Sequence, residues 1–223
     1  MELAAETMME LWKAAMRHIL MNGRRFVDDD GKRCREIQNL VVTIKKPSSS
    51  IDGVRAMRVV RKWRYPSEEE LANIMLNKEA GGIYDYLYGQ RIFAYNGTLN
   101  QIDEYVVPSL QQRPETRRAI VSLLNPLRDL KMGKKNIIGM SLLQFRIIEK
   151  RLVVTAIIRT SGFFTGWPAN VFQVAKLQAH VARQLQIPAG PLTTISLAAH
   201  IHDENLEDIE LVLGKDVVKD AKE

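Results

Sequence analysis

The order of three apolar segments in the second half of the chain constrains the fold most. Two apolar runs between residues 140 and 158 flank Glu149 and Lys150, a polar pair that is typical of the tip of a long antiparallel hairpin. Residues 168–186 then repeat apolar side chains at helical spacing, and residues 192–201 read as a last strand. A hairpin, a long buried helix and a final strand predict a mixed sheet, with the hairpin at its centre and helices packed on it.

The first half of the chain adds helices and strands to this sheet. Apolar residues recur at three- and four-residue spacing over 8–20, which predicts a helix that ends near Asn22. Residues 37–44 are apolar and β-branched and predict a strand, while Ser67 with Glu70 forms a capping box ahead of another helix. The remaining expected elements are a helix over 98–112, a buried strand over 119–124 and a short acidic helix that begins at Asp203. Together these elements predict the α/β (α+β) class.

Composition limits the size of the core and the kind of ligand. A chain of 223 residues with 46% hydrophobic content can close one sizeable core, so we expect a single domain over 1–223. Lys and Arg outnumber Asp and Glu by 32 to 26, an excess that suits anionic ligands such as phosphates. Cys34 is the one cysteine, which excludes an intrachain disulfide and a multi-cysteine metal site, and we expect no metal.

The N-terminal segment MELAAETMMELWKAAM carries acidic residues where a secretory signal would be basic. No stretch approaches the roughly eighteen uninterrupted apolar residues of a membrane span. We therefore expect a cytoplasmic protein without a membrane segment.

A segment that leaves a strand and opens a helix carries a family resemblance. Arg159-Thr160-Ser161-Gly162, followed by Gly166-Trp167-Pro168-Ala169-Asn170, resembles the signature of the thymidylate synthase and deoxycytidylate hydroxymethylase family. That signature reads roughly Arg-Ser-Cys-Asp, four residues, then Gly-Leu-Pro-Phe-Asn. Further landmarks in the same order are Tyr88-Gly89, Thr116-Arg117-Arg118, Gln144-Phe145 and His200-Ile201-His202, with Asn39-Leu40-Val41-Val42 similar to short archaeal members. The resemblance covers residues 84–210 well and implies a thymidylate-synthase fold.

The resemblance implies a binding site for a nucleotide monophosphate. Arg159 offers a planar bidentate donor to the phosphate, Thr160 adds a hydroxyl, and Ser161 lies beside them. Asn170 presents donor and acceptor together to the O4 and N3 edge of a uracil-like ring, whereas the hydroxymethylases tend to carry aspartate there. The alternatives are a surface arginine that caps a helix or pairs with glutamate, and an amide that hydrogen-bonds backbone.

His200 and Tyr88 complete the implied site. His200 matches the histidine that holds the sugar hydroxyl together with a tyrosine, but His202 occupies the tyrosine position, so sugar recognition differs. Tyr88 matches a tyrosine beside the catalytic centre, where a phenol relays protons through water. The alternatives are ordinary edge-strand histidines and a core aromatic residue.

The resemblance also implies a partner subunit. In the family, the pair that matches Arg117 and Arg118 reaches across a twofold axis into the other subunit's site, so we expect a homodimer; the alternative is a solvated charge pair. A further family arginine follows the first helix and falls near Asp30 here. Nearby basic residues that can replace it are Arg25, Lys32, Arg33 and Arg35.

The chain departs from the family at the reaction centre. The family's cysteine thiolate adds to C6 of the pyrimidine, and this nucleophile position is Gly139 here. Rescue by Cys34 would need a large displacement. Gly162 takes the place of the aspartate that contacts folate. Ordinary thymidylate synthesis is therefore not expected.

Two hypotheses follow from a retained binding site without the thiolate. The first is a transferase that passes a methyl or hydroxymethyl group to an already electron-rich nucleotide, with tetrahydrofolate or tetrahydromethanopterin as the carbon carrier. Trp63, Trp167 and the C-terminal tail are candidates to stack on a pterin; the alternative is that each is an ordinary core or surface position. The second is a nucleotide-binding pseudoenzyme.

A third hypothesis concerns the basic segment 55–64. We interpret residues 48–66 as a loop, part of which pairs at a sheet edge, since arginines alternate there with apolar residues. Trp63 and Tyr65 add aromatic rings that can stack on bases, so RNA or DNA binding is the alternative that this segment allows. The sequence favours it least.

Overall fold

A mixed sheet of eight strands forms the centre of the protein in the computed structural model, which describes residues 1–60, 64–79, 87–133 and 136–214. The strand order is β1-β3-β8-β6-β5-β4, with β2 paired to β3 and β7 paired to β8. β6 and β8 are parallel, as are β1 and β3, while β3–β8 and β5–β6 are antiparallel. The strands are β1 (Glu2–Ala5), β2 (Arg24–Val27), β3 (Arg33–Ile44), β4 (Ile120–Ser122), β5 (Met140–Ile148), β6 (Arg151–Ile158), β7 (Ser161–Gly162) and β8 (Ala189–His202).

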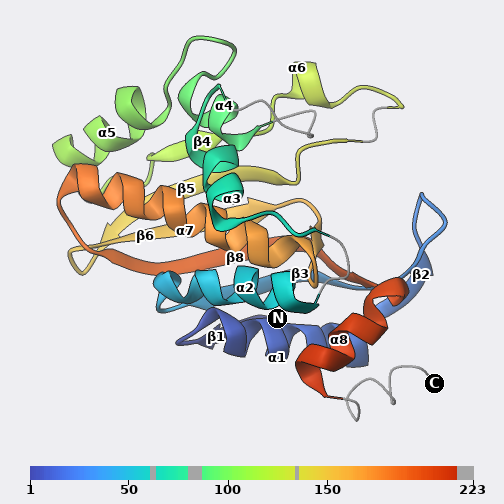
Figure 1. The fold of residues 1–223 in the computed structure, drawn as a ribbon. Coiled ribbons are helices and arrows are strands. Elements are labelled where there is room, and N and C mark those ends of the chain that lie inside the picture. The colour runs from blue at the N-terminus through green and yellow to red at the C-terminus, as the bar shows by residue number, and fades with distance from the viewer. Residues whose placement is uncertain (61–63, 80–86, 134–135, 215–223) are drawn as a thin grey trace.

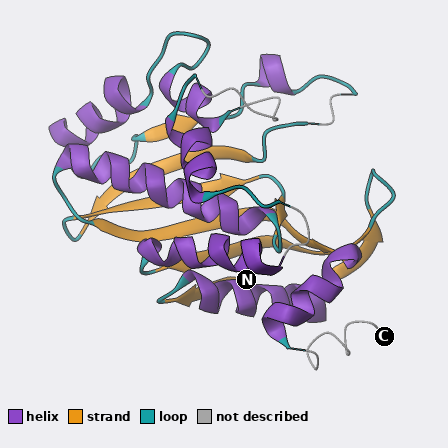
Figure 2. Cartoon of the chain, viewed as in Figure 1, coloured by secondary structure: helices purple, strands orange, loops and turns teal. Residues whose placement is uncertain are grey.

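Helices α1, α2 and α7 lie side by side across one face of this sheet (Figures 1 and 2). The helices are α1 (Met8–Asn22), α2 (Ser50–Val60), α3 (Glu68–Leu76), α4 (Tyr88–Phe93), α5 (Val107–Gln112), α6 (Pro126–Asp129), α7 (Gly166–Leu185) and α8 (Leu206–Leu213). Short 3₁₀ segments cover Pro47–Ser49 and Asp203–Asn205, and a π-helical turn covers Ile102–Val106. None of the described helices is long and apolar enough to cross a membrane.

The long buried helix and the central hairpin are confirmed. Trp167, Phe172 and Leu177 of α7 are fully or almost fully buried, and they belong to the same hydrophobic core as the sheet. Glu149 and Lys150 both adopt positive φ, at 51° and 58°, which is the backbone of a tight two-residue hairpin turn. The α/β class with a mixed sheet therefore holds.

The capping signals also locate helix starts correctly. Ser67 Oγ accepts the Glu70 backbone N–H at 3.1 Å, and the Glu70 carboxylate accepts the Ser67 N–H at 2.7 Å, so α3 begins where the capping box predicts. Thr7 and Glu10 form a second capping box at α1. Two N-terminal N–H groups are thereby satisfied at each helix.

The interpretation of residues 48–66 as a loop with an edge strand is wrong. Residues 50–60 form α2, because its buried positions Ser50, Gly53, Val54 and Met57 repeat at three and four residues rather than at two. A Cβ at Gly53 would lie 2.2 Å from the Met8 side chain, so glycine lets α2 approach α1 closely.

Asn39 has an irregular backbone conformation in the middle of β3. Asn39 has φ of 55°, and the regular pairing of β3 with β8 is interrupted there, between Gln38–Ala198 and Leu40–Ser196. The buried side of β8 changes at the same point, from even-numbered residues up to Ser196 to odd-numbered residues from Ala199. His200 and His202 are therefore only partly buried, whereas the alternating positions Ala199 and Ile201 face the core.

Candidate functional site

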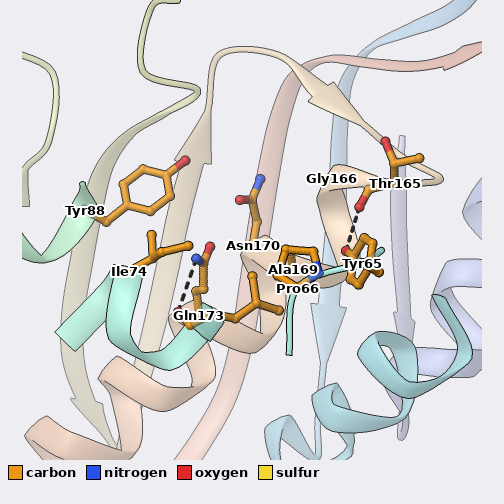
Figure 3. Close-up of a pocket in the computed structure, with 10 residues that line it drawn as sticks. Tyr65, Pro66, Ile74, Tyr88, Thr165, Gly166, Ala169, Asn170 and Gln173 are labelled. Atoms are coloured by element: carbon orange, nitrogen blue, oxygen red, sulfur yellow. Dashed lines mark hydrogen bonds between the residues drawn. The ribbon is translucent and has the colours of Figure 1, made fainter. Parts of the chain in front are cut away.

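A cavity of about 270 Å³ lies between α3, α4 and α7. Figure 3 shows the Asn170 amide between the Tyr88 ring and the pair formed by Tyr65 and Thr165. The lining residues are Tyr65, Pro66, Leu71, Ile74, Tyr88, Thr165, Gly166, Ala169, Asn170 and Gln173. The size is near the lower end for small-ligand sites, which start at about 300 Å³.

Two hydrogen bonds make the walls of the cavity rigid. The Tyr65 hydroxyl donates to the Thr165 carbonyl at 2.7 Å, and the Gln173 amide donates to the Leu71 carbonyl at 3.3 Å. Within the described residues, the Asn170 amide makes no hydrogen bond to protein. Its donor and acceptor are therefore available to a ligand, and the alternative of an amide that hydrogen-bonds backbone is not what the structure shows.

Gly139 lies beside Tyr88, one of the residues that line the cavity. A Cβ at Gly139 would lie 4.0 Å from the Tyr88 hydroxyl and 3.6 Å from the Thr160 carbonyl oxygen, both ordinary contact distances. The Arg159 backbone N–H donates to the Gly139 carbonyl at 2.7 Å. The position expected for the nucleophile thus has room for a Cβ, and close packing does not require glycine there.

Arg159 stands exposed at the end of β6. Its guanidinium donates to the Ile137 carbonyl at 3.3 Å, and it forms no ion pair with any carboxylate in the described part of the chain. A charged, planar group that is held by one carbonyl and is otherwise open to solvent suits an anionic ligand.

Thr160, Gly162 and His200 form a continuous group next to Arg159. The Thr160 hydroxyl lies 3.3 Å from His200 Nδ1, and Gly162 pairs with His200 between β7 and β8. A Cβ at Gly162 would contact Thr165 Oγ1 at 3.5 Å and His200 Nε2 at 3.6 Å, both ordinary contact distances. Burial, and then the nearby His202, lower the pKa of His200, which keeps its imidazole neutral near pH 7.

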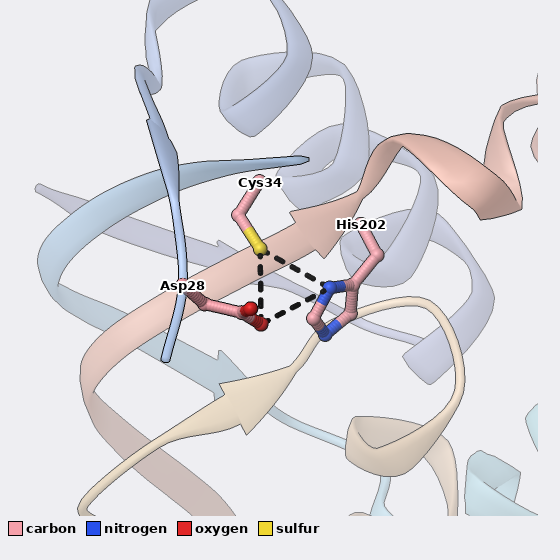
Figure 4. Close-up of side chains that lie close together, drawn as sticks. All are labelled: Asp28, Cys34 and His202. Atoms are coloured by element: carbon pink, nitrogen blue, oxygen red, sulfur yellow. Dashed lines mark hydrogen bonds and ion pairs between the residues drawn. The ribbon is translucent and has the colours of Figure 1, made fainter. Parts of the chain in front are cut away.

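His202 contacts two residues of the β2–β3 hairpin (Figure 4). Its Nδ1 lies 3.1 Å from Cys34 Sγ and 3.7 Å from Asp28 Oδ2, and its ring packs edge-on against His200. Burial, followed by the charge of Asp28, raises the pKa of the Cys34 thiol to about 11. Without another source of activation, Cys34 is a neutral thiol at pH 7 and a poor nucleophile.

Ser161 lies inside the sheet instead of on the cavity wall. Its residue is 1% exposed, it pairs with Ala199, and its hydroxyl has no hydrogen-bond partner in the described part of the protein. A role of Ser161 in ligand binding stays a prediction.

Arg117 and Arg118 lie apart from the cavity, in the exposed segment before β4. Gln144 Nε2 donates to the Arg117 carbonyl at 3.0 Å, which holds this segment against β5. Their guanidinium groups make no hydrogen bond or ion pair among the described residues.

The four basic residues near Asp30 differ in their contacts. Arg35 is 4% exposed, donates to the Leu20 carbonyl at 2.8 Å and lies 3.7 Å from Asp203, so it holds the hairpin to the core. Lys32 pairs with Glu204 at 2.8 Å. Arg33 is exposed at the start of β3. Arg25 lies opposite Arg35 in the antiparallel backbone pairing of β2 with β3.

The described residues do not reproduce the implied contacts to a pterin carrier. Trp167 is fully buried, donates to Thr194 Oγ1 at 3.0 Å and stacks on Phe163, so its candidacy for pterin stacking is wrong. Trp63 and the C-terminal tail beyond residue 214 lie outside the described residues. Gly162 supplies no carboxylate, and we assign no step to a folate-type group.

The structure of the basic segment 55–64 removes the observation on which the nucleic-acid hypothesis depends. Residues 55–60 belong to α2, Arg55 pairs with Glu68 at 3.0 Å, and Arg64 pairs with Glu70. An alternating edge strand is therefore not present in the described part of this segment.

Two cavity residues were not among the predicted ligand-binding side chains. Gln173 is three residues after Asn170, and this helical spacing is the signal that places both amides on one face of α7. For Tyr65 the sequence suggests only stacking on nucleic-acid bases. The contact of Asp28 with His202 depends on a hairpin turn that gives no such signal.

Comparison with known proteins agrees with the fold. A family model described as thymidylate synthase matches residues 21–222. A protein of Methanosarcina barkeri is 30% identical over 211 residues, which cover 94% of this chain and 93% of the relative. A protein of Methanothermobacter thermautotrophicus is 31% identical over 212 residues, which cover 91% and 93%. A protein of Methanocaldococcus jannaschii is 25% identical over 193 residues, which cover 82% of each chain. All three relatives are provisionally named thymidylate synthases.

Proposed function

Because this chain belongs to the thymidylate synthase family, we propose that its cavity binds a nucleoside monophosphate with a uracil-like base. The observation that carries this proposal is the Asn170 amide, which lines the cavity and makes no hydrogen bond to protein among the described residues. An amide offers one donor and one acceptor side by side, which matches the N3 and O4 edge of uracil. Tyr88 lines the same cavity, and a Cβ at Gly139 would lie 4.0 Å from its hydroxyl.

Arg159 and Thr160 bind the phosphate in this proposal. The exposed Arg159 guanidinium can donate two parallel hydrogen bonds, and the Thr160 hydroxyl lies one residue further along the chain. His200, which touches the Thr160 hydroxyl, then lies near the sugar. Its neutral imidazole can both accept and donate a hydrogen bond.

The chemistry that fits Gly139 does not use a covalent enzyme intermediate. We infer that the substrate ring is already electron-rich, so that its carbon attacks an electrophilic one-carbon donor directly. The ring carbon forms the new carbon–carbon bond, the donor's leaving group departs with its bonding electrons, and the ring C–H proton passes to a base. His200, or water bound to the Tyr88 hydroxyl, can accept that proton.

A binding protein without catalysis is the second candidate. Gly139 and Gly162 both lack a side chain at positions where a Cβ would meet only ordinary contacts. Packing therefore does not explain either glycine, and a chain that only senses or sequesters the nucleotide would need neither cysteine nor aspartate there.

The face of the sheet opposite the helices supports a homodimer as the functional unit. Val41, Ile195, Ile157 and Leu142 are in register across β3, β8, β6 and β5, and all four are only partly buried. Leu197 on the same central strand β8 is 45% exposed. A contiguous apolar row on a sheet face is the kind of surface that a second copy covers.

Thermal shift with a panel of nucleoside monophosphates tests the binding proposal. We expect UMP or dUMP to raise Tm more than CMP, AMP or the free nucleosides, since binding to the folded state stabilises it. Arg159→Ala should abolish the shift, while Arg17→Ala, an exposed arginine on α1, should leave it unchanged. An unchanged shift in Arg159→Ala would contradict the phosphate assignment.

Incubation with nucleotides labelled with tritium at C5 separates the two candidate functions. Release of label from an electron-rich pyrimidine nucleotide in the presence of a one-carbon donor supports the transferase. Binding without release from any nucleotide of the panel supports the binding protein.

A further inference from the structure

Asp28, Cys34 and His202 bring three chemically different ligand groups together outside the cavity (Figure 4). Their carboxylate oxygen, thiol sulfur and imidazole nitrogen all lie within 4.8 Å of one another. Cys34 is 2% exposed, whereas the side chains of Asp28 and His202 are 24% and 23% exposed. The group is thus closed on the thiol side and open to solvent on the other.

The backbone holds these three residues in place. Cys34 and His202 are direct partners in the antiparallel pairing of β3 with β8, so their side chains lie on the same face. Asp28 sits in the turn that joins β2 to β3, where its N–H donates to the Lys32 carbonyl at 2.9 Å. Gly31 has φ of 78° and makes this tight turn possible.

The three contacts converge on one point. Cys34 Sγ lies 3.1 Å from His202 Nδ1 and 3.6 Å from Asp28 Oδ2, and the third edge, from His202 Nδ1 to Asp28 Oδ2, measures 3.7 Å. In a proton relay the thiol and the carboxylate would contact opposite nitrogens of the imidazole. Here both face Nδ1, which is the arrangement of ligands around a shared centre.

We propose that Asp28, Cys34 and His202 bind one divalent transition-metal ion, with Zn²⁺ as the best match. Thiolate, imidazole and carboxylate are the three ligand types that zinc takes in proteins, at bond lengths of about 2.0–2.3 Å. A tetrahedral ion with these bonds separates neighbouring ligand atoms by about 3.3–3.6 Å. The observed edges of 3.1, 3.6 and 3.7 Å need only small adjustments to reach that geometry.

The surroundings of the group are those of a metal site with one open position. Asp28 Oδ1 accepts the backbone N–H groups of Asp30 and Lys32 at 3.0 and 2.8 Å, which orients the carboxylate and leaves Oδ2 for the ion. Metal binding replaces the thiol proton, which passes to water, and the thiolate and carboxylate then balance the two positive charges. Water completes the fourth position on the exposed side.

This inference departs from the expectation of no metal, which rested on the presence of a single cysteine. It does not depend on the proposed nucleotide site. The ion would tie the β2–β3 hairpin, which carries Lys32 and Arg33, to the end of β8 next to His200.

Titration of the purified, metal-stripped chain with Zn²⁺ and Co²⁺ tests the proposal. We expect one Zn²⁺ per chain in competition with a chromophoric chelator, and a thiolate-to-cobalt charge-transfer band with tetrahedral d–d bands for Co²⁺. Cys34→Ser should abolish the charge-transfer band. Asp28→Asn and His202→Gln should each weaken Zn²⁺ binding by more than the about 10–100-fold that is typical of losing an outer-shell partner.

Matched controls separate ligation from general effects. Asp29 lies in the same turn as Asp28, and His18 lies on α1. The variants Asp29→Asn and His18→Gln should both bind Zn²⁺ as tightly as the unaltered chain. Circular dichroism without metal checks that each variant folds. Because the Co²⁺ spectrum of the unaltered chain is itself diagnostic, a variant that fails to fold does not remove the test. The proposal is overturned if the unaltered chain binds no stoichiometric Zn²⁺, if its Co²⁺ complex lacks the thiolate band, or if the controls lose as much affinity as the ligand variants.

Discussion

Gly139 stands where the family resemblance implies a cysteine nucleophile. Its carbonyl accepts the Arg159 N–H, so the backbone of the reaction centre is tied to the residue proposed to bind phosphate. A side chain at Gly139 would emerge between the Tyr88 hydroxyl and the Thr160 carbonyl. The position expected for the nucleophile therefore lacks a side chain, although a Cβ there would meet only ordinary contacts.

Replacing Gly139 with cysteine tests whether the nucleotide lies where we propose. The variant should fold with nearly unchanged stability, because its Cβ would meet only contacts of 3.6 and 4.0 Å. With a thiol beside Tyr88, we expect Gly139→Cys to release tritium from C5 of labelled dUMP or UMP, whereas the unaltered chain does not. Ser141→Cys, two residues further along, is the matched control and should release none. No release by Gly139→Cys, despite an intact thermal shift with nucleotide, would mean that the base does not lie against this residue.

Asn170 should decide which pyrimidine binds. In Asn170→Asp the side chain becomes an acceptor only, so it no longer complements uracil and instead accepts a hydrogen bond from the exocyclic amine of cytosine. We expect the ratio of Kd values for UMP and CMP to change by about 10–100-fold in favour of CMP, as a buried hydrogen-bond mismatch costs roughly 1–3 kcal/mol. Isothermal titration calorimetry measures both constants. Asn73→Asp on the exposed side of α3 should leave the ratio unchanged, and an unaffected ratio in Asn170→Asp would remove the base-recognition role.

At the scale of elements, α4 determines where Tyr88 lies. This helix has only six residues and depends on its neighbours for position. Gly89 lets its first turn approach the end of α3, since a Cβ there would lie 2.4 Å from the Asn77 carbonyl oxygen. Arg91 on its next turn donates to the buried carboxylate of Asp129 at 2.6 Å.

Gly89→Ala should displace α4 and with it Tyr88. The clash is with backbone atoms that cannot rotate away, so we expect a loss of about 1–3 kcal/mol in the free energy of unfolding, the usual cost of overpacking. Urea unfolding measures this loss, and thermal shift shows whether nucleotide binding weakens as well. Gly166→Ala is the matched control, because its Cβ would meet nothing within 4 Å, and a helical alanine should keep or raise stability. Equal stabilities of the two variants would contradict the close approach.

Asp129→Asn should be far more destabilising than a change at an exposed ion pair. The side chains of Arg91 and Asp129 are 6% and 1% exposed, and removing one charge leaves the other buried without its counter-charge. Breaking such a pair costs about 3–5 kcal/mol. Arg55→Ala, which breaks the pair with Glu68 at the surface, should cost at most about 1 kcal/mol. Chemical denaturation of both variants measures the difference, and a similar cost in each would show that the α4 pair is not a structural anchor.

The elements that the sequence predicts correctly are those whose signal is local. α7, the β5–β6 hairpin and the start of α3 follow from periodicity, a polar tip and a capping box, all of which depend on neighbouring residues. The sequence predicts a loop with a part paired at a sheet edge in place of α2, because apolar residues alternate there with arginines, and burial against α1 decides its conformation. The strand expected over 119–124 is shorter, at Ile120–Ser122, because only these residues pair with β5.

The site could be predicted only in part for the same reason. The segment from Arg159 to Asn170 carries a local signature, so the sequence predicts one site for these residues, and the structure places Asn170 on the cavity wall. The contact of Cys34 with His202 depends on strand pairing across 168 positions, and that of Asp28 on the turn between β2 and β3. No spacing in the sequence indicates either contact.

At the scale of the whole molecule, the sheet separates two surfaces with different roles. One face carries the helices and the cavity, while the other carries the apolar row that includes Val41, Ile195 and Ile157. Arg117 and Arg118 stand outside the cavity of their own chain, with guanidinium groups that have no partner in the described part of the chain. Both observations have one explanation if two copies pack sheet to sheet and each supplies arginines to the other.

Mixing two inactive variants tests that explanation directly. Arg159→Ala and the double variant Arg117→Ala, Arg118→Ala should each fail to bind nucleotide as homodimers. When both variants are unfolded and refolded together, mixed dimers form. In a mixed dimer one site carries all three substitutions, and the other site has Arg159 from one chain and Arg117 and Arg118 from the other. Random pairing then restores about one quarter of the sites, which equilibrium dialysis with labelled nucleotide counts. A mixture of Arg159→Ala with Arg17→Ala provides the comparison. In that mixture every Arg17→Ala chain keeps an intact site whichever partner it has, so refolding the two together does not change the number of intact sites. No recovery in the first mixture would show that Arg117 and Arg118 act within their own chain, and nucleotide binding by the double variant alone would show that they do not act on the site.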